Sequence, residues 1–453
     1  MTIDSSARLL VFLVVLCPAS AWACFTNERA EILQEQNPDM DFASHAHHMH
    51  QQERIEFDFA GPQACEDGFA GPFPCKGVEL AGWLELPEIG GGTGADNWGW
   101  RDPQSDRLFA LMGRSNGVAF VEMTDPENPV FIGNLPRPDG VGDSTWTDIK
   151  TFGHHALIVA DAVSGHGMQV FDLNRLLEDF EEPQQFTHDA HYTEFNSAHN
   201  IAVNPESGFA YAVGSDTCSG GLHMIDISDP LQPQFAGCFS EDEYTHDVQC
   251  VNYRGPDQRF HGHEICVASN EDSVTVVDVT DKDAPEMIGR HTYNHSYTHQ
   301  GWFTPDQRFF VFDDELDEQV QELRGTRTLI LDLAELDSAD APAEYTASGL
   351  SIDHNQYVVA DHTFQANYRR GLRILRIDDA ETGQLEEVAY FDTYPESEGL
   401  GFQGAWNVFP FFGNDLILVS DINRGLFVLR VTDPAVKDVL KRLFSDRFEQ
   451  PGI

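Results

Sequence analysis

Residues 221–230 read GLHMIDISDP, a short apolar strand that ends at Asp and Pro, and the same pattern recurs along the chain. We find seven copies: GVAFVEMTDP (117–126), GMQVFDL (167–173), GLHMIDISDP (221–230), SVTVVDVTD (273–281), RTLILDL (327–333), GLRILRIDD (371–379) and GLFVLRVTDP (425–434). Around 221–230, three further short strands complete a unit over 199–240: HNIAVNP, GFAYAVGSD and PQFAGCF. β-branched and aromatic runs broken by Gly, Pro, Asn or Asp are typical of hairpin-linked strands.

The first strand of the unit also recurs seven times, at intervals of 47 to 55 residues. A four-stranded unit with this spacing predicts an all-β chain, a seven-bladed β-propeller of four-stranded blades. No fourth strand follows Val431, whereas GVELAGWLELP (77–87) resembles the fourth strands PVFIGNLP and PEMIGRH. We therefore expect this N-terminal strand to close the last blade. Even spacing and the spare strand disfavour the alternative, an array of two-sheet sandwiches.

The ends of the chain predict export. An apolar run, Leu9 to Leu16, precedes Ala21-Trp22-Ala23, which indicates a cleaved secretory signal over 1–23. We expect an N-terminal extension over 24–76, the propeller over 77–434, and a tail over 435–453 that forms a short helix. No other segment is apolar enough to span a bilayer. The location is therefore periplasmic, cell-surface or extracellular.

Export predicts oxidised cysteines. Local spacing pairs Cys65 with Cys75, Cys218 with Cys238, and Cys250 with Cys266, because each pair closes a short loop or faces across a hairpin. Cys24 is left over at the predicted cleavage site. It could carry a lipid anchor, although Trp22 fits a lipoprotein signal poorly; an intermolecular bridge and a free thiol remain alternatives.

The formal net charge is −48, carried by 75 acidic and 27 basic residues. Such a field repels nucleic acid and anionic lipid and attracts cations. Nucleic acid is therefore excluded as a partner. The plain interpretation of most of this charge is a solvated surface suited to salty surroundings.

Several long motifs resemble the choice-of-anchor B family of exported bacterial proteins with LVIVD-type repeats. They include CEDGFAGPFPCKGVEL, SGHGMQVFDL, TCSGGLHMIDISDP, YTHDVQC, SNEDSVTVVDVTDK, YTHQGW, DDELDE, QANYRRGLRIL and SDINRGLFVLR, and they span roughly residues 60–433. The resemblance implies an exported propeller that is often attached to the surface. It implies no reaction and no catalytic residues, and this chain lacks the C-terminal anchor of the anchored members.

One mouth of the central channel is the candidate site. The innermost strands open with Trp98, Trp146, His199, His246, His299, His354 and Trp406. Carboxylates should gather on the same rim from the residues after the openers, Asp148 and Asp247, and from second-strand ends at Asp161, Asp216, Asp313 and Asp361. Imidazoles with carboxylates nearby suit a divalent metal, zinc or copper. The four histidines, His199, His246, His299 and His354, are the predicted metal ligands.

A structural role for these histidines competes with the metal site. A His at a strand start can hydrogen-bond the backbone of the next blade, and Trp at three of the seven positions cannot ligate a metal. The His tract SHAHHMHQQ (44–52) is a second place where metal could bind, although such tracts are usually linkers.

We therefore expect an exported binding or scaffold propeller for an undefined protein or small-molecule ligand. The alternative is a metal-dependent enzyme that uses the same mouth. No G-x-S-x-G elbow or phosphate loop occurs.

Overall fold

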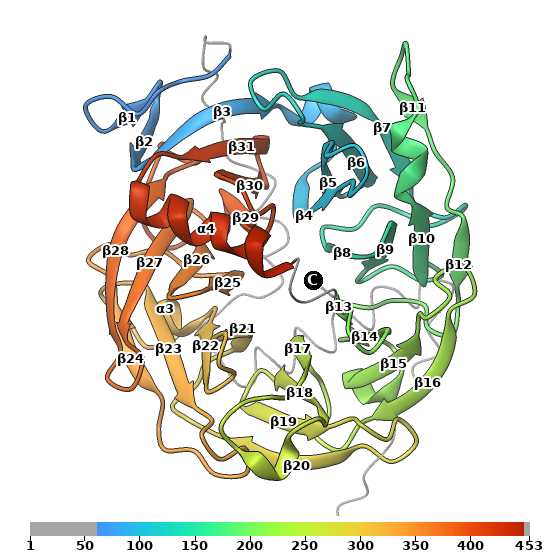
Figure 1. Cartoon of the computed structure of the whole chain (residues 1–453), viewed down its shortest axis with the longest axis vertical. Coiled ribbons are helices and arrows are strands. Elements are labelled where there is room, and N and C mark those ends of the chain that lie inside the picture. The colour runs from blue at the N-terminus through green and yellow to red at the C-terminus, as the bar shows by residue number, and fades with distance from the viewer. Residues whose placement is uncertain (1–60, 448–453) are drawn as a thin grey trace, which may run out of the picture. The chain divides into compact units, whose positions relative to one another are not determined.

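The computed structural model describes residues 61–447, with side chains to residue 442. Its strands form seven antiparallel sheets arranged around a common axis (Figure 1). This confirms the predicted seven-bladed propeller of four-stranded blades. The predicted signal over 1–23, Cys24 and the His tract over 44–52 lie outside the described residues.

In blades 1 to 4 the strands follow chain order from the innermost strand outward. Blade 1 is β4 (Gly94–Arg101), β5 (Leu108–Arg114), β6 (Gly117–Glu122) and β7 (Val130–Pro136). Blade 2 is β8 (Thr147–Phe152), β9 (His155–Ala160), β10 (Met168–Asp172) and β12 (Ala190–Tyr192). Blade 3 is β13 (Asn200–Asn204), β14 (Phe209–Val213), β15 (Leu222–Asp226) and β16 (Gln234–Phe239). Blade 4 is β17 (Asp247–Asn252), β18 (Glu264–Ser269), β19 (Val274–Asp278) and β20 (Glu286–His291).

Blades 5 and 6 follow the same order, whereas the outermost strand of blade 7 is an N-terminal one. Blade 5 is β21 (Thr298–Phe303), β22 (Phe309–Asp314), β23 (Arg327–Asp332) and β24 (Ala343–Thr346). Blade 6 is β25 (Gln356–Val359), β26 (His362–Ala366), β27 (Leu372–Asp379) and β28 (Gln384–Phe391). Blade 7 is β29 (Ala405–Phe409), β30 (Leu416–Asp421), β31 (Gly425–Val431) and β3 (Val78–Leu84).

The ring closes through β3, as the sequence predicts. β3 pairs antiparallel with β31 from Val78↔Val431 to Leu84↔Leu426, so an N-terminal strand is the outer strand of the last blade. The 3-10 helix η1 (Leu86–Ile89) then leads from β3 into β4. Radial closure of this kind leaves no open sheet edge between the first and last blades.

Smaller elements decorate the ring. The hairpin β1 (Phe69–Ala70) and β2 (Phe73–Lys76) adds to the outer strand of blade 6, and β11 (Gln184–Gln185) pairs parallel with β7. The remaining helices are η2 (Leu173–Leu177), η3 (Cys218–Gly220), η4 (Gln258–Phe260), α3 (Asp317–Val320) and α4 (Pro434–Arg447). The described part of the predicted extension over 24–76 therefore packs on the propeller.

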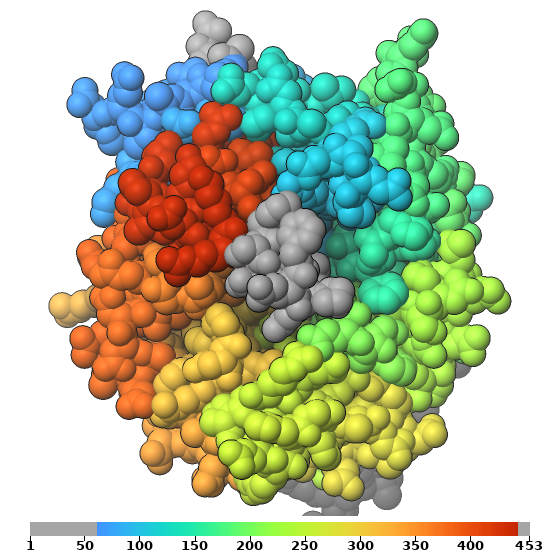
Figure 2. All heavy atoms as spheres, viewed as in Figure 1, coloured from blue at the N-terminus to red at the C-terminus, as the bar shows by residue number. Residues whose placement is uncertain are grey.

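Helix α4 covers part of blades 6 and 7. It follows the far end of β31 and contacts β25 and β31, and it is the red segment on the face seen in Figures 1 and 2. Val436, Val439 and Leu440 are buried in the core, at a spacing that places them on one helix face. No helix among the described residues is long and apolar enough to cross a membrane.

The core lies between neighbouring blades. Both faces of each sheet are covered, so the second strands read as continuous apolar runs; every residue of β5, for example, is buried. Aromatic rings join the blades: Phe120 of blade 1 stacks on Phe171 of blade 2 with centroids 4.6 Å apart.

Glycines in four of the outer strands allow the backbone of the next blade to approach closely. A β-carbon on Gly237 of β16 would lie 1.8 Å from the carbonyl oxygen of Lys282, and one on Gly82 of β3 would lie 2.4 Å from that of Pro126. Gly133 meets the carbonyl oxygen of Gln184 in β11, and Gly289 meets that of Leu336. At Gly82 and Gly237, the D-P or D-K turn after the third strand of the next blade thus packs on the glycine.

Three disulfides join Cys65 to Cys75, Cys218 to Cys238, and Cys250 to Cys266. These are the predicted pairs. Cys250 and Cys266 are direct partners in the β17–β18 register. Three disulfides fit an oxidising compartment outside the cytoplasm.

A buried histidine beside one disulfide should make stability depend on pH. His223 is 2% exposed, and its ring nitrogens lie 2.8 Å from Tyr192 Oη and 2.8 Å from Thr217 Oγ1. Burial lowers the pKa of His223 to about 4. The ring is therefore neutral in the folded chain, whereas it takes a proton on unfolding below about pH 6.5. Its contribution to stability is present above pH 6.5 and is lost as the pH falls toward 4.

We predict that His223→Gln reduces this loss. Between pH 6.5 and pH 5 the variant should lose about 2 kcal/mol less unfolding free energy than the parent, at about 1.36 kcal/mol per pH unit. Urea unfolding at both pH values measures the difference. Equal losses in the two proteins would contradict the assignment.

Candidate functional site: the histidine row at the channel mouth

Four histidines from consecutive blades form a row at one mouth of the channel. The ring centroids of His199 and His246 are 4.3 Å apart, those of His246 and His299 are 4.2 Å apart, and those of His299 and His354 are 4.5 Å apart. Trp406 continues the row 4.8 Å beyond His354. Each residue stands at the start of an innermost strand, and the repeat of the blade therefore brings these rings together.

Three of the four Nδ1 atoms face acceptors on a neighbouring blade, whereas His299 Nδ1 has no hydrogen-bond partner in the described part of the chain. His246 Nδ1 lies 3.0 Å from the carbonyl oxygen of His299, and His354 Nδ1 lies 2.5 Å from that of Trp406. His199 Nδ1 lies 2.8 Å from Asp161 Oδ2. Two histidines thus do tie adjacent blades together, as the structural interpretation predicts. An Nδ1 held by a carbonyl or carboxylate is also the usual arrangement of a metal ligand, because it directs Nε2 to the metal.

Two of the rings converge on one carboxylate. His299 Nε2 lies 3.9 Å from Glu315 Oε2, and His354 Nε2 lies 3.9 Å from Glu315 Oε1. One ligand atom from each residue lies within 4.8 Å of the others, and all three side chains are buried. In a tetrahedral zinc site with bonds of about 2.0–2.1 Å, ligand atoms lie about 3.3 Å apart. Small side-chain shifts would bring this set to that spacing.

The protonation states suit such a site. Burial and the neighbouring histidines lower the pKa of His299 well below its usual value, so its ring is neutral, as a metal ligand must be. Burial raises the pKa of Glu315 to about 7, against a hydrogen bond of 2.6 Å from Tyr368 Oη. A bound cation would favour the ionised carboxylate.

A charged layer lies deeper in the channel. Lys150 Nζ is 2.7 Å from Asp148 Oδ1 and 3.5 Å from Asp96 Oδ2, and it stands over the ring of Trp98 at 4.7 Å. Asp148 Oδ2 also accepts a hydrogen bond from the Ile201 N–H of the next blade. Burial raises the pKa of Asp247 to about 7. These groups are bound to one another and to the strands, which indicates a structural role.

Aromatic rings pack across the channel beyond this layer. The ring of Phe411 lies 6.0 Å from Trp98, 6.0 Å from Trp302 and 5.4 Å from Tyr357. These residues come from blades 1, 5, 6 and 7 and meet at the axis. Beyond the histidine row the channel is therefore filled with side chains.

Some of the predicted rim residues contact the histidine row and others do not. Asp161 bonds His199, Asp313 Oδ2 lies 3.5 Å from His299 Nδ1, and Trp146 lies 6.4 Å from the ring of His199. Asp216 instead accepts hydrogen bonds from the backbone and side chain of Asn196. It holds a loop and does not contact the row.

Two rim residues lie elsewhere than we expected. Asp361 stands in the tight turn between β25 and β26, at the end away from the row, and its side chain is 61% exposed. Here the strand after His354 is short, so VVAD ends the first strand and does not end the second. Trp98 lies further along its strand: Gly94 pairs with Arg114, and a register shift between Gly94 and Asn97 puts Ala95 and Asp96 at the opening.

The sequence interpretation missed Glu315 and Tyr368. Glu315 lies in the run DDELDE, of which Asp313 was predicted to lie at the rim. Tyr368 follows β26. The sequence interpretation placed the end of this second strand too early, because the first strand of blade 6 is shorter than expected. The acidic run directly after a second strand was the available signal for Glu315.

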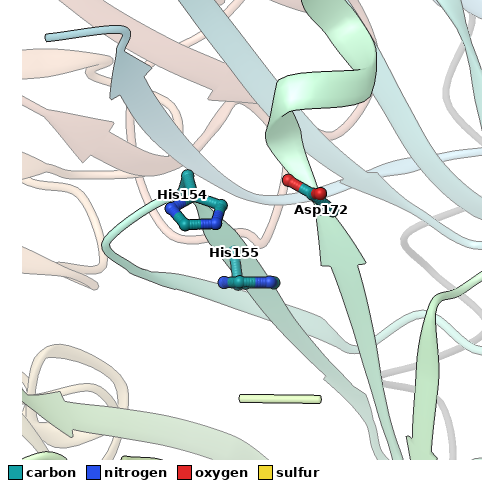
Figure 3. Close-up of side chains that lie close together, drawn as sticks. All are labelled: His154, His155 and Asp172. Atoms are coloured by element: carbon teal, nitrogen blue, oxygen red, sulfur yellow. The ribbon is translucent and has the colours of Figure 1, made fainter. Parts of the chain in front are cut away.

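A second group of metal-ligand type lies on another part of blade 2. His154, in the turn between β8 and β9, and His155, the first residue of β9, lie near Asp172 at the end of β10 (Figure 3). Asp172 Oδ1 already accepts hydrogen bonds from the backbone and side chain of Asn174, and His154 is exposed. Burial lowers the pKa of His155. This group is therefore more exposed to solvent than the set around Glu315, and its carboxylate already accepts hydrogen bonds from the protein.

Comparison with known proteins gives matches to solved structures at 12% identity and TM-scores below 0.5. No family model matches the chain, and no curated protein matches its sequence. The β-propeller domain of Cps50 (Swd1) from Myceliophteria thermophila matches with a TM-score of 0.49, over 79% of this chain and 100% of that one. A functionally unknown protein from Desulfotomaculum acetoxidans matches with a TM-score of 0.43, over 68% and 87%, and Kuenenia stuttgartiensis hydrazine synthase with 0.45, over 73% and 94%. Membership of the choice-of-anchor B family stays a prediction.

Proposed function

We propose that this protein is an exported binding propeller that holds a divalent transition metal, zinc or copper, at the mouth lined by the histidine row. His299, His354 and Glu315 are the ligands in this proposal, and His246 and His199 extend the row beside them. Imidazole with carboxylate is a donor set that suits zinc and copper. The net charge of −48 would raise the local concentration of cations at the mouth.

One observation carries the proposal: two imidazoles and one carboxylate, all buried, converge within 4.8 Å. Burial of a carboxylate between neutral rings is unfavourable unless it gains a partner. Tyr368 supplies one hydrogen bond to Glu315 Oε1. A metal ion held between the three groups would be a further partner for the Glu315 carboxylate.

Export and surface attachment belong to the same proposal. The apolar run before Ala23, the three disulfides and the resemblance to the choice-of-anchor B family support export. In this proposal Cys24, at the predicted cleavage site, is the residue that a lipid anchor would modify. The ligand of the outer loops would be a protein or a small molecule.

The number of protein ligands keeps an enzymatic role as the second candidate. Three ligands leave the fourth position of a tetrahedral ion for water or substrate, as in catalytic zinc sites. A scaffold would need no such position. If a small inhibitory anion such as azide binds to the zinc-loaded protein at the fourth position of the metal, the enzymatic alternative gains support.

Zinc titration by calorimetry tests the proposal. We predict that His299→Ala with His354→Ala weakens the tightest zinc site by more than about 100-fold, because two of three protein ligands are lost. His154→Ala with His155→Ala is the matched control, which removes two histidines from the other group and should leave that site intact. All three proteins keep the tract at 44–52, so its binding cancels in the comparison. Unchanged tight binding in the first variant, or none in the parent, would refute the metal site.

A further inference from the structure

Buried acids gather beside the histidine row, on the side of blades 5 and 6. The end of β22 and helix α3 contribute Asp313, Asp317 and Glu318, which are 0%, 0% and 1% exposed. Among the described residues, the arginine or lysine that forms an ion pair with these three is Arg327, through Asp317. The local charge is therefore far from balanced by the protein.

Each of these three acids accepts a hydrogen bond from an N–H donor on one oxygen. Asp313 Oδ1 accepts from the Gln300 N–H at 2.7 Å, and Glu318 Oε1 accepts from the Arg327 N–H at 2.9 Å. Asp317 Oδ2 accepts from Arg327 Nε at 2.6 Å. The second oxygens, Asp313 Oδ2, Asp317 Oδ1 and Glu318 Oε2, are buried and accept no hydrogen bond from an N–H or hydroxyl donor of the described residues. The carboxyl groups of Asp317 and Glu318 lie within hydrogen-bonding reach of each other.

An acid from the next blade faces the same place. Asp353 precedes β25 and is 3% exposed, and both of its carboxylate oxygens are buried without a hydrogen-bond partner. Its charge interacts with those of Asp313, Asp317 and Glu318. A side chain from a separate element, with no bond to the protein, thus points to a ligand held between the two blades.

The neighbouring Asp314 differs, because both of its carboxylate oxygens accept hydrogen bonds. It accepts hydrogen bonds from the N–H groups of Ser296 and Tyr297 at 2.7 and 2.6 Å, and from Tyr293 Oη at 3.0 Å. Its role is to fold the loop before β21. Asp313, Asp317 and Glu318 each accept on one oxygen only, and Asp353 accepts on neither, so a fold-stabilising role does not account for their remaining oxygens.

We propose that Asp313, Asp317, Glu318 and Asp353 form a second cation site, which binds a hard, oxygen-preferring divalent cation of the calcium class. Calcium takes six to eight oxygen ligands, including carboxylates and waters, in flexible geometry. Four carboxyl groups from two blades offer five buried oxygens that accept from no N–H or hydroxyl donor. The site lacks the nitrogen donors that zinc or copper prefer. Its bound cation would join blades 5 and 6 next to the row, with Asp313 between the two sites.

Calcium titration of the full, EDTA-treated chain tests this site. Calorimetry should show Ca²⁺ binding by the parent, and the melting temperature should rise with Ca²⁺ concentration, since a ligand of the folded state stabilises it. Asp317→Asn with Asp353→Asn should weaken binding by more than about tenfold and remove the thermal shift, because affinity follows ligand charge. Asp139→Asn with Asp283→Asn, two exposed acids, is the control with the same change in charge and should behave as the parent.

Further arms separate the outcomes. His299→Ala with His354→Ala should keep the Ca²⁺ response, so loss of the zinc site does not imply loss of this one. If the Asn variant fails to fold, Tb³⁺ luminescence of the parent, displaced by Ca²⁺ and not by an equal concentration of Mg²⁺, still supports the site. No Ca²⁺ binding by the parent, or equal binding in the Asn variant, would overturn the proposal. If the parent binds no Ca²⁺ and the Asn variant is more stable than the parent, the acids are simply protonated in the folded protein.

Discussion

Deletion of residues 77–87 is expected to abolish the cooperative unfolding transition of the protein. β3 lies within this segment and is the outer strand of blade 7, where it pairs along β31 from Val431 to Leu426. Val78, Leu80 and Ala81 are at most 1% exposed. Burial of a Val or Leu side chain contributes about 1.5–3 kcal/mol each, and the total stability of a domain is about 5–15 kcal/mol. Without β3, blade 7 would also expose an open edge.

Circular dichroism during thermal unfolding measures this effect. Deletion of residues 61–76 is the control, since it removes β1 and β2 but keeps β3 and the ring closure. We expect the control to unfold cooperatively at a reduced temperature, because β2 pairs with β28 only at Cys75↔Phe391 and Lys76↔Tyr390. A sharp parent-like transition after deletion of 77–87 would show that the closure does not hold the ring.

Gly237→Val should destabilise the protein by at least about 3 kcal/mol. A β-carbon at this position would lie 1.8 Å from the carbonyl oxygen of Lys282, which belongs to the turn after the third strand of blade 4. Backbone cannot rotate away as a flexible side chain can, so β16 or the turn must move. The contact between blades 3 and 4 is lost in either case.

Chemical denaturation measures the loss for Gly237→Val. Gly142→Val is the matched control, because no atom lies within 4 Å of a β-carbon placed there, and it should cost little. Equal stability of the two variants would mean that the docking of turns on outer-strand glycines does not contribute to stability.

The repeat was predictable because each blade buries both faces of its sheet in the same way. The third strands, which lie inside the blade, have the most uniform environment and therefore the clearest pattern. The closure by β3 followed from one missing strand after Val431. The disulfides followed from short loops and a hairpin, where local spacing decides which cysteines can meet.

The site was only partly predictable because its residues depend on where strands begin and end. A register shift in β4 moved Trp98 along the strand, and the short β25 put Asp361 at the other end of blade 6. Both errors come from changes of one to three residues that hydrophobic patterns do not reveal. Glu315 reaches His354 from a different blade, and such a contact depends on three-dimensional packing.

Anomalous diffraction at the zinc edge, from crystals of the full chain loaded with zinc, tests the central claim most directly. We predict a peak between His299, His354 and Glu315, with Nε2–zinc distances of about 2.0–2.1 Å. The same crystals would show whether the group of His154, His155 and Asp172 takes up metal. Strong zinc peaks only at that group or elsewhere, with none beside Glu315, would contradict the proposed metal site.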